Sequence, residues 1–333
     1  MTDPQAAARF RHLGAFTIFA VYCVILAGGI VRASGAGMGC PDWPTCFGEW
    51  IPPTSEAQLP ANYHEIYAAR GYDNTTFNPV KTWTEYTNRL IGASTGLLIL
   101  LTVWASRIYL RGDKAIFYLA LTVFLLVGFQ GWLGSAVVAS NLKPIMITLH
   151  MLLALFIVAL LIYAIARSQQ PILSSLECPE LSPKVQTVLK LAMAMTLLQV
   201  AMGTQVRESI NFIAHGSANL DREYWRESFP IIFYVHRSFS SLILFTNLWL
   251  AWKIRQSAAS RLLTRTAYIL SGLIVTAILA GVSLDRLGFP AIAQPLHLLM
   301  ANLIFGTQFF LFICLNYASP QSRKQDQLSS NYQ

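Results

Sequence analysis

The chain has 333 residues, of which 54% are hydrophobic and only 12% are charged, and its mean hydropathy is +0.48. This composition excludes a soluble globular protein, because such proteins carry about twice that share of charged residues. The formal net charge of +8 comes mostly from Lys and Arg beside apolar segments, and no basic patch interleaved with aromatic residues indicates nucleic-acid binding.

Eight segments are long and apolar enough to cross a membrane, which takes roughly 20 residues. Because backbone polar groups in lipid must be satisfied within the segment, we expect these segments to be helices. The predicted fold class is therefore all-α, a polytopic membrane protein with eight transmembrane helices. They lie near residues 13–32, 90–110, 115–139, 145–166, 187–206, 231–252, 266–284 and 291–317.

Lys and Arg concentrate in alternate loops, which indicates that these loops and both termini are cytoplasmic. The first segment lacks a small-residue cleavage site, and no Arg- and Ser-rich transit peptide precedes it. We therefore expect a multi-pass protein of a bacterial inner (cytoplasmic) membrane. The residues that set this orientation are Arg9, Arg11, Arg107, Arg111, Lys114, Arg167, Lys184, Lys190, Lys253, Arg255, Arg261, Arg265, Arg323 and Lys324.

Two similar halves follow one another in the chain. Residues 28–32 (Gly-Gly-Ile-Val-Arg) end the first segment, and residues 203–207 (Gly-Thr-Gln-Val-Arg) end the fifth in the same way. Four helices in each half give both the same orientation, as in repeats related by an axis along the membrane normal. We predict two tandem four-helix bundles, over 1–167 and 168–333. The first has a long outer loop at about 33–87 that covers its outer end.

Three histidines lie inside apolar segments at repeat-related positions. His236 precedes His297 by 61 residues, and Asn88 precedes His150 by 62 residues at the matching places of the first half. An ionisable group inside a membrane is costly and marks a functional site or a polar partner in the bundle. Two histidines on neighbouring helices can bind haem iron from both sides, so we interpret His236 and His297 as haem ligands. The structural alternative is a histidine hydrogen-bonded across helices.

In the first half, the position that corresponds to His236 is Asn88, a poor ligand for iron. The residues then indicate a haem with one strong axial ligand, His150, and an open sixth position that suits oxygen activation. Alternatively, the first half binds no haem and His150 is only packed. If the helix extends outward by a turn, Glu85 shares a face with Asn88 and Arg89. Glu85 would then accept protons at the pocket mouth, or simply pair with Arg89 near a helix start.

Four arginines and two cysteines lie at or beyond the outer membrane boundary. The arginines can each bind a haem propionate through a forked, charge-assisted contact, although interfacial arginines are also ordinary. Cys40 and Cys46 lie in an oxidising compartment, which favours a disulfide that either braces the loop or exchanges with redox partners. The arginines are Arg32, Arg89, Arg207 and Arg237.

Taken together, these residues resemble the haem A synthase family, membrane enzymes that oxidise haem O to haem A for cytochrome oxidases. The resemblance covers about residues 13–317, and it departs at Asn88, where the family pattern has histidine. Its carriers are residues 35–46 (Gly-Ala-Gly-Met-Gly-Cys-Pro-Asp-Trp-Pro-Thr-Cys), 85–89 (Glu-Tyr-Thr-Asn-Arg), 149–150 (Leu-His), 236–237 (His-Arg) and 296–297 (Leu-His).

The resemblance implies a b-type haem (haem b) held by His236 and His297, and haem O as the substrate with His150 at its iron. It further implies a catalytic role for Glu85 and a disulfide between Cys40 and Cys46. The implied reaction is successive hydroxylation of one haem methyl group, with loss of water from the geminal diol to leave a formyl group. The expected partners are haem O, membrane lipid, a haem O synthase and an electron donor, with a homo-oligomer as one arrangement.

Two other functions compete with this enzyme. A membrane di-haem or mono-haem electron carrier between quinol and a partner, without substrate turnover, needs His236 and His297 but neither Glu85 nor the long loop. A transporter would explain the tandem repeat, but no broken helix supports it. We prefer the enzyme because Glu85 and the long loop then have a function.

Overall fold

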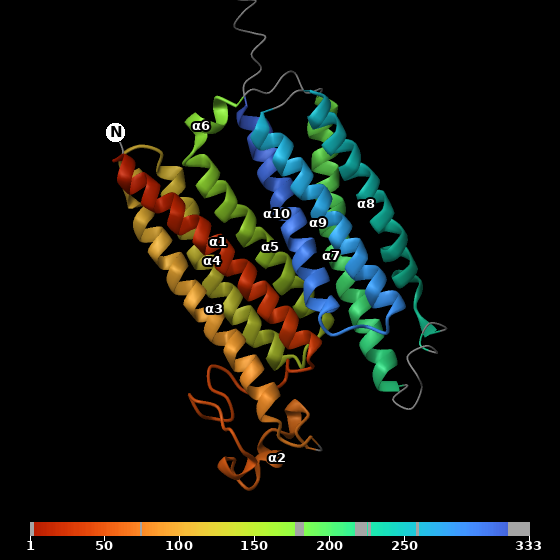
Figure 1. The fold of residues 1–333 in the computed structure, drawn as a ribbon. Coiled ribbons are helices and arrows are strands. Elements are labelled where there is room, and N and C mark those ends of the chain that lie inside the picture. The colour runs from red at the N-terminus through yellow and green to blue at the C-terminus, as the bar shows by residue number, and fades with distance from the viewer. Residues whose placement is uncertain are drawn as a thin grey trace, which may run out of the picture. The chain divides into compact units, whose positions relative to one another are not determined.

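A computed structural model describes residues 3–73, 75–176, 183–216, 225, 228–257 and 260–318. Among these residues, eight helices are long and apolar enough to cross a membrane, so the all-α prediction is confirmed (Figure 1). They are α1 (Pro4–Ala33), α3 (Pro79–Ser106), α4 (Lys114–Ala139), α5 (Pro144–Arg167), α7 (Pro183–Gly216), α8 (Ile231–Gln256), α9 (Arg261–Arg286) and α10 (Ala293–Tyr317).

In the described part of the chain, five shorter helical segments with defined bounds lie between them. Three lie in the outer loop, one continues the end of α3, and one follows α5. They are the 3-10 turns η1 (Glu56–Gln58), η2 (Ala68–Arg70) and η3 (Arg107–Arg111), and the short helices α2 (Tyr63–Ile66) and α6 (Gln170–Ser174).

Several long helices extend beyond the ranges predicted from hydropathy, and α3 does so at its start. The outer loop, predicted at about 33–87, ends in a helical stretch, because α3 begins at Pro79. Asn78 caps this helix by accepting a hydrogen bond from Lys81 N–H at 3.1 Å, and proline fits the first helical position. Hydropathy missed these turns because Lys81 and Glu85 make them polar. Likewise, α1 begins at Pro4 where 13 was predicted, and α9 begins at Arg261 where 266 was predicted. At its other end, α7 continues to Gly216, beyond the predicted 206.

The chain divides into two compact units. The first comprises the described residues of 1–157 and 289–299, and the second those of 158–288 and 300–333. Two of the three boundaries fall inside α5 and α10, so both of these helices contribute to both units. The division at 167 drawn from the sequence repeat stays a prediction.

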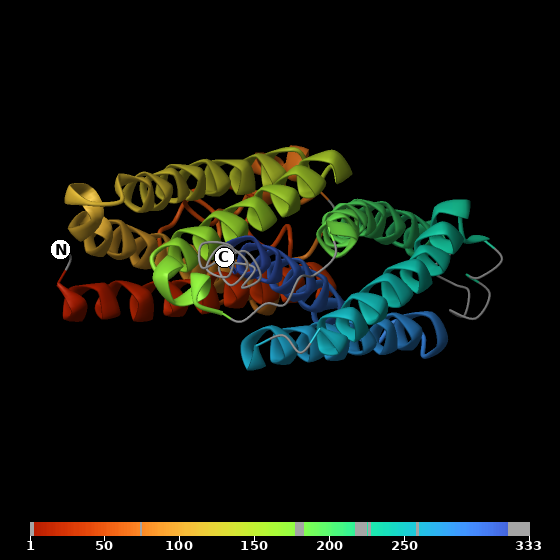
Figure 2. The same ribbon diagram turned by 90° about the horizontal axis from the view of Figure 1, so that it is seen from above.

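Within each unit, consecutive long helices pack side by side. In the first unit α1 packs on α3 and α3 on α4, and in the second unit α7 packs on α8 and α8 on α9 (Figure 2). Buried polar pairs join these helices. Thr17 on α1 and Thr102 on α3 have hydroxyls 2.9 Å apart, and in the second unit the Gln308 amide donates to Asn247 Oδ1 at 3.0 Å. Such interhelical hydrogen bonds are typical of helices packed in lipid.

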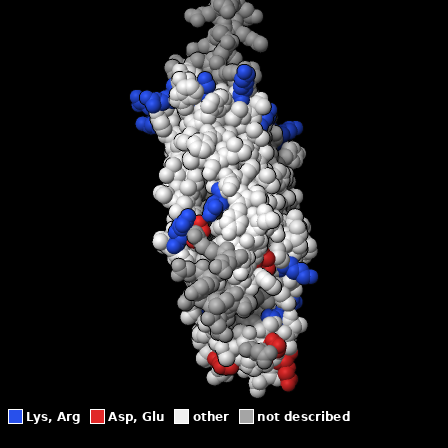
Figure 3. All heavy atoms as spheres, turned by 90° about the vertical axis from the view of Figure 1, so that its right-hand side faces the viewer, with Lys and Arg blue, Asp and Glu red and all other residues white. Residues whose placement is uncertain are grey.

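Basic residues mark the end of the second unit where α8 stops and α9 begins. Lys253 and Arg255 lie in the last turn of α8, and Arg261 begins α9. On the face drawn in Figure 3, several Lys and Arg side chains lie at the upper end above a stretch of uncharged surface, and others lie farther down beside Asp and Glu. This pattern fits helices that cross a bilayer. Arg323 and Lys324 lie outside the described residues, and the cytoplasmic orientation stays a prediction.

Candidate functional site

Asn88 occupies in the first unit the place that His236 occupies in the second. Asn88 of α3 lies opposite Gly28 of α1, where an added Cβ would stand 3.9 Å from Asn88 Oδ1. His236 of α8 lies opposite Gly203 of α7, where an added Cβ would stand 3.3 Å from His236 Cε1. Gly28 and Gly203 are themselves repeat-related, so the two pairs are one packing arrangement with different side chains. The geometry therefore supports the sequence alignment of Asn88 with His236.

The other two histidines lie on the last long helices of the halves. His150 of α5 lies opposite Gly134 of α4, where an added Cβ would stand 3.4 Å from His150 Cε1. His297 lies in the second turn of α10, in the stretch that belongs to the first unit. His236 belongs to the second unit, so the joint binding of one haem by His236 and His297 stays a prediction.

Glu85 is a buried carboxylate, with 4% of the residue exposed. Because α3 extends to Pro79, Glu85 shares a helix face with Asn88 and Arg89, as the sequence analysis required. Its Oε1 pairs with an Arg89 terminal nitrogen at 2.5 Å, and its Oε2 accepts the Cys40 N–H at 2.9 Å. Both oxygens thus accept from strong donors, which suits an ionised carboxylate.

Arg89 joins α3 to the outer loop. One terminal nitrogen donates to the carbonyls of Asp42 and Thr45 at 2.7 and 2.9 Å, and the other donates to the Cys40 carbonyl at 3.2 Å as well as to Glu85. The guanidinium therefore holds the disulfide-bonded segment against the helix that carries Glu85. A haem propionate would have to compete with these carbonyls for Arg89.

Gly39 lets the loop approach α3 closely. A Cβ at this residue would overlap the main-chain carbonyl of Lys81. On the same side, the Thr82 hydroxyl donates to the Gly39 carbonyl at 2.8 Å. The contact brings Cys40 within reach of Glu85, so we infer that only glycine fits at position 39.

Cys40 and Cys46 form the predicted disulfide, with an S–S distance of 1.98 Å, and both residues are buried. Asp42, between them, was missed by the sequence analysis. Its carboxylate accepts the Phe47 and Gly48 N–H groups at 2.6 and 2.9 Å. Asp42 stands in the 35–46 motif, but its bonds to N–H groups five and six residues on leave no short-range turn signal in the sequence.

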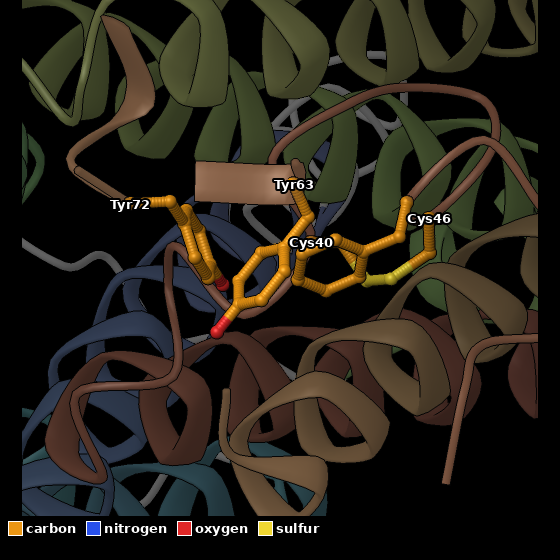
Figure 4. Close-up of a cluster of buried hydrophobic side chains, with 5 residues drawn as sticks. Cys40, Cys46, Tyr63 and Tyr72 are labelled. Atoms are coloured by element: carbon orange, nitrogen blue, oxygen red, sulfur yellow. A yellow bond between two sulfur atoms is a disulfide. The ribbon is translucent and has the colours of Figure 1, made fainter. Parts of the chain in front are cut away.

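The outer loop has its own buried core, which includes Cys40, Cys46, Tyr63 and Tyr72 (Figure 4). Phe47 lies among its aromatic rings. Its ring centroid lies 5.2 Å from that of Tyr72, 5.4 Å from that of Tyr67 and 6.5 Å from that of Tyr63. The Tyr72 hydroxyl donates to the Met38 carbonyl at 2.7 Å. Burial raises the pKa of the Tyr63 and Tyr72 phenols above their usual value near 10. The loop is therefore a folded cap with a hydrophobic core.

The other three arginines predicted to bind propionates differ in their contacts. Arg237 of α8 lies 3.7 Å from Asp285 of α9 and stacks over the Tyr234 ring at 5.4 Å. Arg207 of α7 has a buried Nε with no hydrogen-bond partner among the described residues, so it retains a donor. Arg32 lies in the last turn of α1. Their contacts with haem propionates stay predictions.

Two buried polar atoms in the first unit are suited to a bound ligand. Asn88 Oδ1 and His150 Nδ1 are buried and have no hydrogen-bond partner among the described residues. Leaving a buried polar atom unsatisfied costs about 1–3 kcal/mol, so each such atom calls for an explanation. A haem bound at these side chains would provide one, and we conclude that the residues present fit a haem.

Two glutamines missed by the sequence analysis contact the predicted haem ligands. The Gln130 amide of α4 donates to the His150 carbonyl at 2.9 Å, and the Gln199 amide of α7 donates to the His236 carbonyl at 3.0 Å. The signal in the sequence is that each glutamine stands four residues before a glycine that faces the same histidine.

The comparisons with known proteins agree on one family. The model of the family described as cytochrome oxidase assembly protein matches residues 11–309. A "Heme A synthase" of Alkalihalophilus pseudofirmus is 23% identical over 93% of this chain and 99% of the relative, and one of Halalkalibacterium halodurans is 23% identical over 92% and 97%. A "Heme A synthase" of Shewanella oneidensis is 34% identical over 50% of this chain, and the match spans 48% of that relative.

Proposed function

Because the chain belongs to the cytochrome oxidase assembly protein family, we propose that it is a haem A synthase, an oxidoreductase that converts haem O to haem A for terminal oxidases. The observation that carries this proposal is the alignment over 92–93% of the chain with relatives that bear that name. The buried Glu85–Arg89 pair beneath the disulfide cap supports it, because an electron carrier has no need of either.

The substrate haem O binds in the first unit, with His150 as an iron ligand and Asn88 in its pocket. The buried, unpartnered atoms of these two side chains support this placement. Carboxamides are poor ligands for haem iron, so we expect one strong axial ligand there and high-spin iron. Asn88 then contributes shape and polarity to the pocket in place of the family's second histidine.

The reaction turns one methyl group of haem O into a formyl group. Two successive hydroxylations give a geminal diol, and loss of one water leaves the aldehyde. The iron porphyrin supplies the oxidation chemistry. Glu85 would accept a proton during hydroxylation or diol dehydration, since each of its oxygens retains a lone pair beyond its present bond. The folded loop, held by Arg89, would exclude water from the reactive intermediates.

The second half would hold a haem b, the group that would supply electron-transfer chemistry. His236 and His297 would hold it, because two imidazoles suit a haem that passes electrons. Arg207 and Arg237 would bind its propionates. The buried Nε of Arg207 supports this role, whereas Arg237 would first have to release Asp285.

The eight apolar helices make the chain a multi-pass membrane protein. We place it in a bacterial inner membrane with both termini cytoplasmic, so that the Cys40–Cys46 loop faces the oxidising side. Its partners would then be haem O, a haem O synthase that supplies it and an electron donor, with a homo-oligomer as one arrangement.

Expression in a bacterium that makes haem O but lacks its own haem A synthase tests the activity. Haems extracted from the membranes are separated by chromatography. We expect haem A with the chain and none with an empty vector. If only haem B and haem O appear, while the purified protein shows a normal six-coordinate spectrum, the electron-carrier function is correct instead.

Asn88→His tests which side chain faces the substrate iron. We expect the substrate haem to change from high-spin to low-spin, because a second imidazole completes the axial pair. Absorption and electron paramagnetic resonance spectra of the purified, haem O-loaded protein measure this change. A spectrum identical to that of the wild type would show that position 88 does not face iron.

A further inference from the structure

In each half, one predicted iron ligand is contacted twice by the neighbouring helix: a glutamine bonds its main chain, and a glycine faces its ring. Gln130 contacts the main chain of His150, and Gln199 contacts the main chain of His236, through amide N–H bonds of 2.9 and 3.0 Å. In both cases the glycine four residues later on the same helix faces the edge of the histidine ring, at 3.4 and 3.3 Å from an ideal Cβ. Residues four apart share a helix face, so one face fixes both the backbone and the ring.

We propose that Gln130 and Gln199 are positioning residues, which fix the orientation of two histidines that bind haem iron. This inference rests on the proposed function. A helical carbonyl has a second lone pair beyond its intrahelical bond, and the glutamine amide uses it. Groups that orient a metal-ligating histidine tune the metal as well as the ligand.

Stability alone explains these glutamines poorly. The amide Oε1 atoms of both Gln130 and Gln199 are buried and have no hydrogen-bond partner among the described residues. Interhelical hydrogen bonds in lipid contribute only modestly to stability, and an unsatisfied buried oxygen offsets that contribution. The amide hydrogen bond instead fixes the position of the helix that carries the histidine relative to its neighbour.

Internal duplication does not explain them either. The repeat position of Gln130 is Ala277, four residues before Gly281, and that of Gln199 is Val24, four residues before Gly28. Neither Ala277 nor Val24 can donate a side-chain hydrogen bond. In each half, a glutamine contacts one of the two ligand positions and none contacts the other. The two contacted positions, His150 and His236, are not related by the repeat.

Gln199 also has a second contact, since its amide nitrogen lies 3.5 Å from His236 Nε2. An imidazole nitrogen that binds iron has no lone pair left to accept a hydrogen bond, so this contact and iron binding through Nε2 exclude each other. The bond to the His236 carbonyl is compatible with iron binding, and the positioning function depends on that bond.

Gln199→Met tests the second half in the purified, haem-loaded protein. Methionine keeps the length of the side chain but removes the amide donor. We expect unchanged haem content with a shifted and broadened low-spin paramagnetic resonance signal, because the ring plane is no longer fixed. Gln205→Met, on the exposed side of the same helix, is the matched control and should keep the wild-type signal. A Gln199→Met signal identical to that of the wild type would overturn the proposal.

Gln130→Met and Gly134→Ala test the first half by resonance Raman spectroscopy of the reduced, haem O-loaded protein. Both should shift the iron–histidine vibration, the first by freeing the backbone and the second by pushing the ring edge. Gly131→Ala is the control, since a Cβ there meets nothing within 4 Å. If Gly134→Ala does not fold, Gln130→Met decides. Unchanged vibrations overturn this inference alone, whereas a wild-type protein that binds no haem overturns the proposed function as well.

Discussion

Replacing Glu85 by Gln is expected to lower haem A formation by about 100-fold or more, the usual contribution of a proton-transferring side chain. Glutamine keeps the size of the side chain and an oxygen that can accept the Cys40 N–H, but it cannot accept a proton or pair with Arg89. Bound haem O should accumulate while haem A disappears. The ratio of the two haems, extracted from the purified variant, measures this.

Glu65→Gln is the matched control, because Glu65 is an exposed glutamate of the same outer loop. It should leave haem A formation at the wild-type level. Intact disulfide in the Glu85→Gln protein, checked by thiol alkylation and mass spectrometry, would show that the cap still folds. A Glu85→Gln protein that makes haem A at the wild-type rate would show that this carboxylate has no role in the reaction.

His236→Ala and His297→Ala are each expected to abolish the low-spin b-type spectrum. Removing either imidazole leaves iron with one protein ligand, which changes its spin state and weakens its binding. Absorption spectra of the reduced protein and haem content per polypeptide measure the loss. We expect haem A formation to fall as well, because electrons no longer reach the substrate.

His12→Ala serves as the control, since it removes an exposed imidazole near the start of α1. Its spectrum should match that of the wild type. A low-spin spectrum that survives in both His236→Ala and His297→Ala would contradict the assignment of these ligands. If only one of the two variants loses the low-spin spectrum, only the histidine replaced in that variant is an iron ligand.

The sequence predicted the number and type of the long helices because length and apolar content alone decide whether a segment can cross lipid. It did not predict where α3 begins. Its first turns carry Lys81, whose side chain is exposed, and Glu85, whose carboxylate is bound by the Cys40 N–H and by Arg89. A hydropathy profile cannot represent such contacts. The folded core of the outer loop was missed for a related reason, since its aromatic residues lack strand or helix periodicity.

The candidate site was only partly readable from the sequence. The spacing of Asn88, His150, His236 and His297 followed from the repeat, and the shared face of Glu85 and Arg89 followed from helical geometry. The attachment of Arg89 to the loop carbonyls was not predictable, because main-chain carbonyls leave no trace in residue types. Gln130 and Gln199 were overlooked because an amide at helix depth resembles any polar residue until its partner on the next helix is known.

The most direct test of the proposed activity is the mass of the haem recovered from the purified protein after loading with haem O under turnover conditions. The proposed reaction adds one oxygen atom and removes two hydrogens, so the mass of haem A should appear, preceded by that of the alcohol with one added oxygen. Recovery of unchanged haem O from wild-type protein that is loaded, reduced and supplied with oxygen would contradict the proposal.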